Sequence, residues 1–198
     1  MRRAQQKEHT KKLLQQTAIE LFKKQGYGKT TVSQITANAG VAKGTFFNYF
    51  ESKQAVLHTI QEQQAEYMEK EAEKIFEQEG KIKEGLYRLW ENIALHLEEA
   101  GRPLIRSLFH VLITDESFQR KELLQSRKFE ELLILLFEEG RKRKEFLDNF
   151  YFEQFSLMMI HHFTGVLFYW CTSEGSPPLS TLIRQSIPLL FKGISIED

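Results

Sequence analysis

Residues 30–53 read TTVSQITANAGVAKGTFFNYFESK, and this stretch carries the densest structural signals in the chain. Thr31 is followed three residues later by Gln34, the spacing of a capping box that satisfies two backbone donors at a helix start. The apolar positions that follow, such as Ile35, recur at helical spacing. Gly40 comes next, and glycine enters the left-handed conformation that ends a helix at no steric cost. The stretch therefore predicts a short helix from Thr31 to Gly40.

A second short helix is expected directly after this turn. Phe46 and Phe50 lie four residues apart, so they share one face and can pack against the first helix. Ser52 is placed to cap a third helix. The outer side of the second helix then carries small, polar or basic residues, which are Lys43, Gly44, Thr45, Asn48 and Tyr49. This is the layout of a helix-turn-helix, which places its second helix in the major groove of DNA.

The chemistry of the outer residues suits DNA. Lys43 can donate to guanine O6 and N7, and Thr45 offers a hydroxyl group together with a methyl group for thymine. Gly44 lets the backbone approach closely. Thr30 and Lys53 each lie at the start of a predicted helix, where N–H groups and positive charge favour a phosphate.

The same residues resemble the TetR family of bacterial transcriptional regulators over about residues 9–58. The matching segments are Gly26-Tyr27, Thr30-Thr31-Val32, Ile35, Ala39-Gly40-Val41, Lys43-Gly44-Thr45, Asn48-Tyr49-Phe50 and Ser52-Lys53. By this resemblance the DNA-contacting positions are Thr30, Thr31, Lys43, Gly44, Thr45, Asn48, Tyr49 and Lys53. Two residues depart from the family pattern. Ala42 stands where a serine-type cap is frequent, and Phe47 stands where a phosphate-binding tyrosine is common.

Charge divides the chain into two parts, although its net charge is zero. Residues 1–58 hold ten basic and three acidic side chains, and residues 59–198 hold 17 basic and 24 acidic ones. A basic head followed by an acidic body is typical of a polyanion-binding module joined to a different domain. We therefore expect a DNA-binding domain at 1–58 and a second domain at 59–198.

The remaining periodicity predicts an all-α protein of about nine helices. Outside the motif we expect helices over about 10–25, 52–78, 82–100, 103–113, 117–140, 147–173 and 179–192, the last bent by Pro188. Arg2, Arg3 and Lys7 fit either an arm that touches DNA or a frayed tail. The basic run at 141–144 fits a second nucleic-acid patch or, as we prefer, a solvated helix end.

The last two predicted helices are too apolar for one-sided burial. Residues 154–173 contain no charged side chain, but interrupting polar groups such as His161 favour a helix buried in protein over one that spans a membrane. The resemblance implies a homodimer formed through both helices. The candidate interface residues are Phe163, Val166, Leu167, Trp170, Leu182, Ile183, Ile187 and Leu190.

The resemblance also implies a small, largely apolar effector that binds the second domain and moves the helix beginning at Ser52. Candidate lining residues are Trp90, Phe109, Phe129, Phe137, Phe155 and His162. Aromatic side chains at helical spacing also build ordinary cores. Fatty acyl compounds, lipophilic cations and phenolic compounds all remain open as effectors.

The sequence lacks the motifs of the common enzyme, metal-binding and cofactor-binding classes. It contains no G-x-S-x-G turn, no H-E-x-x-H motif, no paired cysteines and no phosphate-binding glycine loop, so we expect no enzyme, metal or cofactor. The single Cys171 fits a reducing cytoplasm, either as a small buried hydrophobic residue or as a redox sensor. The hypothesis is a sequence-specific regulator, a repressor released from a near-palindromic operator by its effector. The alternative is an architectural or partner-controlled DNA-binding protein without an effector.

Overall fold

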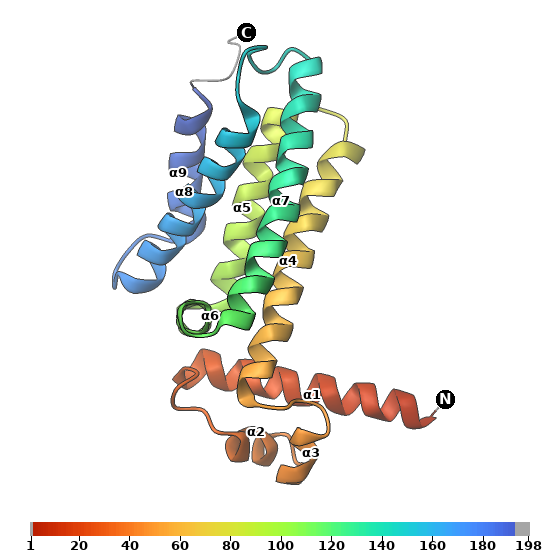
Figure 1. Ribbon diagram of the computed structural model, residues 1–198. Helices are drawn as coiled ribbons and strands as arrows, with labels where there is room; N and C mark the ends of the chain where they lie inside the picture. The colour runs from red at the N-terminus through yellow and green to blue at the C-terminus, as the bar shows by residue number, and fades with distance from the viewer. Residues whose placement is uncertain (1, 193–198) are drawn as a thin grey trace. The chain divides into compact units, whose positions relative to one another are not determined.

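The computed structural model describes residues 2–192, with side chains from residue 5 onward. These residues form nine α-helices and no β-strand, which confirms the all-α prediction (Figure 1). The helices are α1 (Arg2–Gln25), α2 (Val32–Asn38), α3 (Lys43–Phe47), α4 (Lys53–Glu77), α5 (Ile82–Ala100), α6 (Arg102–Thr114), α7 (Glu116–Lys142), α8 (Phe152–Thr172) and α9 (Leu179–Phe191).

Two helix starts differ clearly from the predicted ones. Helix α1 begins at Arg2 instead of about Thr10, so the backbone of residues 2–9 is helical, and the predicted contact of this segment with DNA stays a prediction. Helix α8 begins at Phe152 instead of about residue 147. Pro188 lies inside α9, three residues before the end of that helix. A proline at this position has no N–H to donate to the carbonyl of Arg184, yet α9 continues to Phe191, and the predicted bend stays a prediction.

The described chain separates into two compact units. The first comprises Met1–Glu62 with Ala100–Gln119, and the second comprises Gln63–Glu99 with Arg120–Asp198. Helix α4 is continuous and contributes to both units. The predicted domain boundary near residue 58 stays a prediction, while the grouping of α6 with the first unit was not foreseen. Within that unit α1 packs against both α2 and α6.

Within the first unit, α4 also contacts the start of α7. The side-chain amide of Gln61 donates to the carbonyl of Phe118 at 3.2 Å, and the ring of His58 lies 5.0 Å from the Phe118 ring. Asp115 accepts hydrogen bonds from the Ser117 hydroxyl and the Phe118 N–H, at 2.6 and 2.7 Å. These bonds to its charged form lower the pKa of Asp115 to about 2. Asp115 thus caps the beginning of α7.

A cluster of aromatic rings forms one end of the second unit's core. Phe137 on α7 lies at its centre, and the centroids of the surrounding rings are 5.3 to 5.9 Å away. These rings are those of Phe146, Phe152, Phe155 and Phe191. Gly140 adjoins the cluster because a Cβ there would overlap the ring of Phe146. The cluster joins α7, the following loop, α8 and α9.

Two carboxylates from distant parts of the sequence cap helices in this second unit. Glu145 accepts hydrogen bonds from the backbone N–H groups of Ile82 and Lys83, both at 2.9 Å, at the start of α5. Glu98 accepts one from the N–H of Ser180 at 2.6 Å, at the start of α9. Negative side chains stabilise helix N-termini, where the first N–H groups lack partners within the helix.

Candidate nucleic-acid interface

The turn between α2 and α3 has the predicted geometry. The Gln34 N–H donates to the Thr31 hydroxyl at 3.2 Å, while the Thr31 N–H donates to the Gln34 side chain at 2.8 Å. This confirms the capping box. Gly40 adopts a φ of 68° in the left-handed region, and the N–H of Val41 closes the turn on the Thr36 carbonyl at 3.0 Å. Short-range bonds therefore fix where α3 starts.

Two phenylalanines anchor α3 from within. Phe46 is fully buried and Phe50 is 3% exposed, as their spacing predicted. Ala42 precedes the helix and makes no side-chain capping bond. Although α3 ends at Phe47, the N–H of Phe50 still donates to the Phe46 carbonyl at 3.0 Å. This bond continues the helical path for one more turn.

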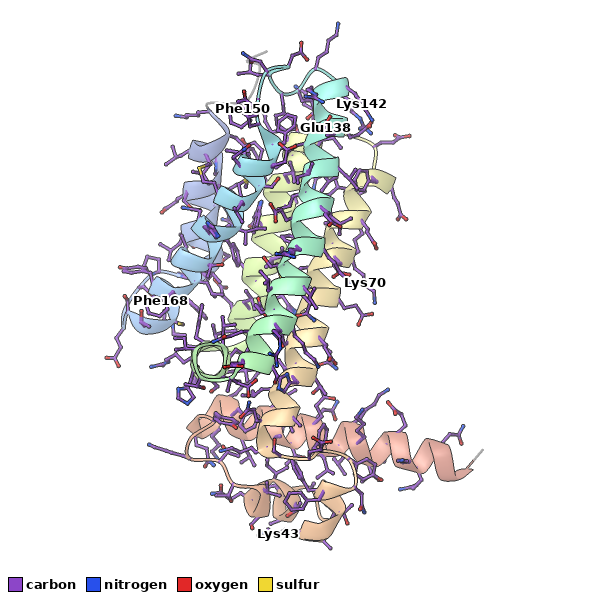
Figure 2. All side chains as sticks on the ribbon, viewed as in Figure 1. Lys43, Lys70, Glu138, Lys142, Phe150 and Phe168 are labelled. Carbon is purple, nitrogen blue, oxygen red and sulfur yellow. The ribbon has the colours of Figure 1, made fainter. Side chains whose placement is uncertain are left out.

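Five predicted DNA-contacting residues gather around α3. Lys43, Gly44 and Asn48 are exposed, while Thr45 and Tyr49 are half-buried. Lys43 projects outward from the first turn of α3 (Figure 2). The segment thus presents an ammonium group, an amide and a bare stretch of backbone to solvent. These groups are suited to base edges and phosphates.

Thr30 has an internal role in the structure. Its side chain is 1% exposed, and its hydroxyl donates to the Gly26 carbonyl at 2.8 Å. Its backbone N–H donates to the Tyr27 carbonyl at 3.2 Å. Both donors of Thr30 are therefore occupied inside the loop between α1 and α2. The predicted phosphate contact at this residue would require the loop to open.

Lys53 fastens the start of α4 to the same loop. Its ammonium group donates to the carbonyls of Tyr27 and Thr30 at 2.6 and 2.7 Å, and it lies 3.9 Å from the centroid of the Tyr27 ring. Burial lowers the pKa of Lys53. The third N–H of the ammonium group is left for another acceptor, so a phosphate contact at Lys53 stays a prediction. A cation in the first turn of a helix opposes the helix dipole, and this was the sequence signal for a nearby acceptor.

Phe47 is the surface residue whose importance the sequence analysis missed. It was treated only as the loss of a tyrosine hydroxyl. In the structure its side chain is 52% exposed, although it is a large hydrophobic residue on the short helix that carries Lys43.

The predicted effector-lining residues fall into separate places. Trp90 is 1% exposed, and its ring lies 5.7 Å from Phe129 and 5.1 Å from Phe163. Phe137 and Phe155 belong to the aromatic cluster of α7–α9. Phe109 lies on α6 and therefore in the other unit. Among the described residues the buried indole N–H of Trp90 has no hydrogen-bond partner.

His162 lines a hollow between α8 and α9. Its Nε2 is 2.8 Å from the hydroxyl oxygen of Ser186, and burial lowers its pKa. The hollow has a volume of ≈ 490 Å³, and Val166 and Leu182 also line it. The structure thus places a predicted effector residue beside two predicted interface residues.

The other predicted interface residues divide between the inside and the surface of the second unit. Four are buried in its core, namely Phe163, Trp170, Ile183 and Ile187. Leu167 and Leu190 are partly exposed. The most exposed apolar side chains on the two helices were not predicted, and they are Leu157, Met158, Phe168, Tyr169 and Leu189. Phe168 lies near the end of α8 (Figure 2).

Within residues 2–192, none of the helices combines the length and apolar character needed to cross a bilayer. This includes α8, which carries the uncharged run. The described side chains also contain no group of three or more potential metal ligands.

Comparison with known proteins finds a match to bacterial regulators in the N-terminal part of the chain. Residues 14–60 match the model of the bacterial regulatory proteins, tetR family. An uncharacterised HTH-type transcriptional regulator of Bacillus subtilis, YerO, is 44% identical over 41 residues, which are 21% of this chain and 14% of that protein. The curated relatives are matched over only 14% to 24% of their own lengths.

Solved structures agree with the fold over nearly the whole chain. FadR of Thermus thermophilus, a repressor in complex with lauroyl-CoA, has a TM-score of 0.70 and 22% identity, covering 95% of this chain and 96% of that one. FadR of Bacillus subtilis in complex with stearoyl-CoA has a TM-score of 0.71 and 22% identity, covering 91% and 97%. At this identity the likeness shows the fold alone.

Proposed function

Because residues 14–60 match the model of the bacterial regulatory proteins, tetR family, we propose that this chain is a regulator of that family, which binds a near-palindromic operator as a homodimer and represses transcription until an effector releases it. The observation that carries the proposal is the capped α2–α3 turn with Lys43, Gly44 and Asn48 exposed beside it. A two-fold dimer presents two such segments, and therefore recognises two half-sites with the symmetry of a palindrome.

Selection of bound sequences from random duplex DNA tests the DNA-binding part. We expect the full chain to enrich a near-palindrome. Enrichment of no sequence, with binding that only weakens as salt rises, would instead favour the architectural alternative.

Lys43→Ala should then weaken binding to the selected operator by about 1–3 kcal/mol and relax preference at one base position of each half-site. Lys128→Ala is the matched control, because it removes the same charge from an exposed position on α7 in the second unit. A uniform loss over all sequences would assign Lys43 to the DNA backbone.

The proposed dimer uses the exposed apolar side chains of α8 and α9. Leu189 is 61% exposed beside the hollow that Val166 and Leu182 line, and large exposed apolar patches mark interaction sites. Leu189→Glu should lower the molar mass measured by light scattering toward that of a monomer, because it buries an unpaired charge in the interface. Leu135→Glu, on an α7 residue that is 55% exposed, should leave the mass unchanged.

The proposed effector is small and largely apolar and binds within the second unit. The aromatic side chains around Trp90 and its unpartnered indole N–H support an apolar ligand with one hydrogen-bond acceptor. The acyl chains of long-chain acyl-CoA compounds are the first apolar groups to test, because two proteins of the same fold were solved with such compounds. Helix α4 starts at Lys53 and continues into the second unit, so it can transmit the effect.

Titration of the operator complex with lauroyl-CoA and stearoyl-CoA tests this part separately. Release of DNA requires that the effector bind the DNA-free conformation more tightly than the DNA-bound one. No release by these compounds, by lipophilic cations or by phenolic compounds would remove the effector from the proposal and leave operator binding intact.

A further inference from the structure

The exposed ring of Phe47 needs an explanation that the proposed contacts do not supply. It is 52% exposed, whereas its neighbour Phe46 is fully buried. The two rings meet edge to face, with centroids 5.6 Å apart and an interplanar angle of 81°. This packing against a buried neighbour restricts the orientation of the Phe47 ring.

Phe47 lies next to residues that are proposed to contact DNA. Phe47 lies four residues after Lys43 and three after Gly44 on α3, so the three residues share one helix face. Lys43 and Gly44 are exposed on that face. A base edge approached by the Lys43 ammonium group therefore lies within reach of a neighbouring apolar ring.

The chemistry of the ring limits what it can recognise. A phenyl ring has no hydrogen-bond donor and no polar atom, so it cannot hold a phosphate as a tyrosine hydroxyl can. Among the groups that base pairs present in the major groove, the 5-methyl group of thymine is the apolar one, and phenylalanine is one of the side chains that contact it. Contact with this methyl group would also remove apolar surface of Phe47 from water.

We infer that Phe47 is a specificity-determining residue that selects a thymine in each half-site by contact with its 5-methyl group. This inference rests on the proposed function and deepens it, because it adds an apolar contact to the polar ones of Lys43 and Asn48. Thymine discrimination thereby replaces the phosphate contact that a tyrosine at this position would make.

Deoxyuridine substitution tests the inference directly, because it removes the methyl group and keeps the base pair. Each thymine of the selected operator is replaced in turn, and binding is measured for the full chain and for Phe47→Ala. We expect one position in each half-site to weaken wild-type binding by about fourfold, the effect of burying one methyl group. The same substitution should leave the affinity of Phe47→Ala unchanged.

Two further variants make the outcome specific. Phe47→Tyr retains the ring and should retain the sensitivity to deoxyuridine. Leu123→Ala removes a 54% exposed side chain from α7 and should behave as wild type throughout. Thermal melting of each variant by circular dichroism confirms that it is folded, which we expect because both side chains are exposed.

The possible results separate this inference from the proposed function. A selected operator with no sensitive thymine, or one whose sensitivity persists in Phe47→Ala, would overturn the inference and leave operator binding intact. Weaker binding by Phe47→Ala without any sensitive thymine would assign the ring to the sugar–phosphate backbone, and would also overturn it. Failure to select any sequence would overturn the proposed function and the inference together.

Discussion

The α2–α3 turn and the core of the second unit are stabilised by hydrogen bonds that differ greatly in the sequence separation of the bonded residues. In the turn, Thr31 and Gln34 cap α2 across three residues, and the longest tie in this region joins Lys53 to Tyr27 across 26 residues. In the second unit, Glu145 caps α5 across 63 residues and Glu98 caps α9 across 82. The same physical device, a side chain that accepts from helix N–H groups, therefore acts locally in one region and at long range in the other.

This difference explains which region can be recognised from sequence. A local cap has a fixed spacing, so Thr31 and Gln34 are visible as a pattern. A long-range cap has none, because any acidic residue that folding brings near a helix start can serve. We also expect the turn to keep its geometry when the second unit is perturbed, since its bonds lie within a short segment.

The strongest test of that independence is Phe137→Ala. Its ring is fully buried and contacts four other rings, so truncation should lower the free energy of unfolding by about 3–5 kcal/mol. Chemical denaturation measures the loss, and hydrogen exchange should show amides of α7–α9 opening while those of α2 keep their protection. Leu135→Ala, on the exposed side of α7, should change stability by less than about 0.5 kcal/mol. Equal loss of protection in α2 would show that the turn depends on the second unit.

Lys53→Met perturbs the turn region instead of the second unit, because it removes the hydrogen bonds from Lys53 to the α1–α2 loop. Methionine keeps an apolar stem but leaves the carbonyls of Tyr27 and Thr30 without their donor. We expect a loss of about 1–3 kcal/mol in unfolding free energy and faster amide exchange in residues 26–31. Lys29→Met removes an exposed lysine from the same loop and should be nearly neutral. If the two variants behaved alike, the bonds of Lys53 would contribute nothing to holding the loop.

The smallest effects should come from a matched pair of caps. Thr31→Val removes the local cap of α2, and Glu145→Ala removes the long-range cap of α5. Each should cost about 1 kcal/mol, because each leaves helix N–H groups without a side-chain partner. Exchange should accelerate only at the first turn of the affected helix. Glu77→Ala removes an exposed acidic side chain at the C-terminal end of α4, where it caps no helix start, and serves as the control for the loss of charge. If either variant accelerated amide exchange in both α2 and α5, the two caps would not act independently.

The candidate site was only partly predictable, even where the bonds concerned are local. Lys43, Gly44 and Asn48 lie on the surface, as the sequence analysis predicted. Thr30 was assigned to DNA because it precedes a helix, but its hydroxyl is used by the carbonyl of Gly26. That use depends on how α1 ends, and the position of Thr30 beside a helix start does not indicate it.

The apolar helix α8 shows most clearly where sequence patterns fail to predict burial. Tyr169 is 53% exposed and Trp170 is 5% exposed, although they are neighbours in an almost uniformly apolar run. Periodicity indicates a buried face only where polar residues mark the opposite face. On α8 they do not, so the sequence analysis assigned buried and surface residues to the same interface.

The sequence by itself determined the all-α class, the capped turn at Thr31 and Gly40, and the pair Phe46 and Phe50 beneath α3, because each depends on residues a few positions apart. Only the tertiary structure decided that Lys53 fastens the α1–α2 loop, that Glu145 and Glu98 cap distant helices, and that Phe47 is exposed. These features depend on which surfaces the folded chain brings together. Bonds and burial between distant segments leave no fixed spacing in the sequence.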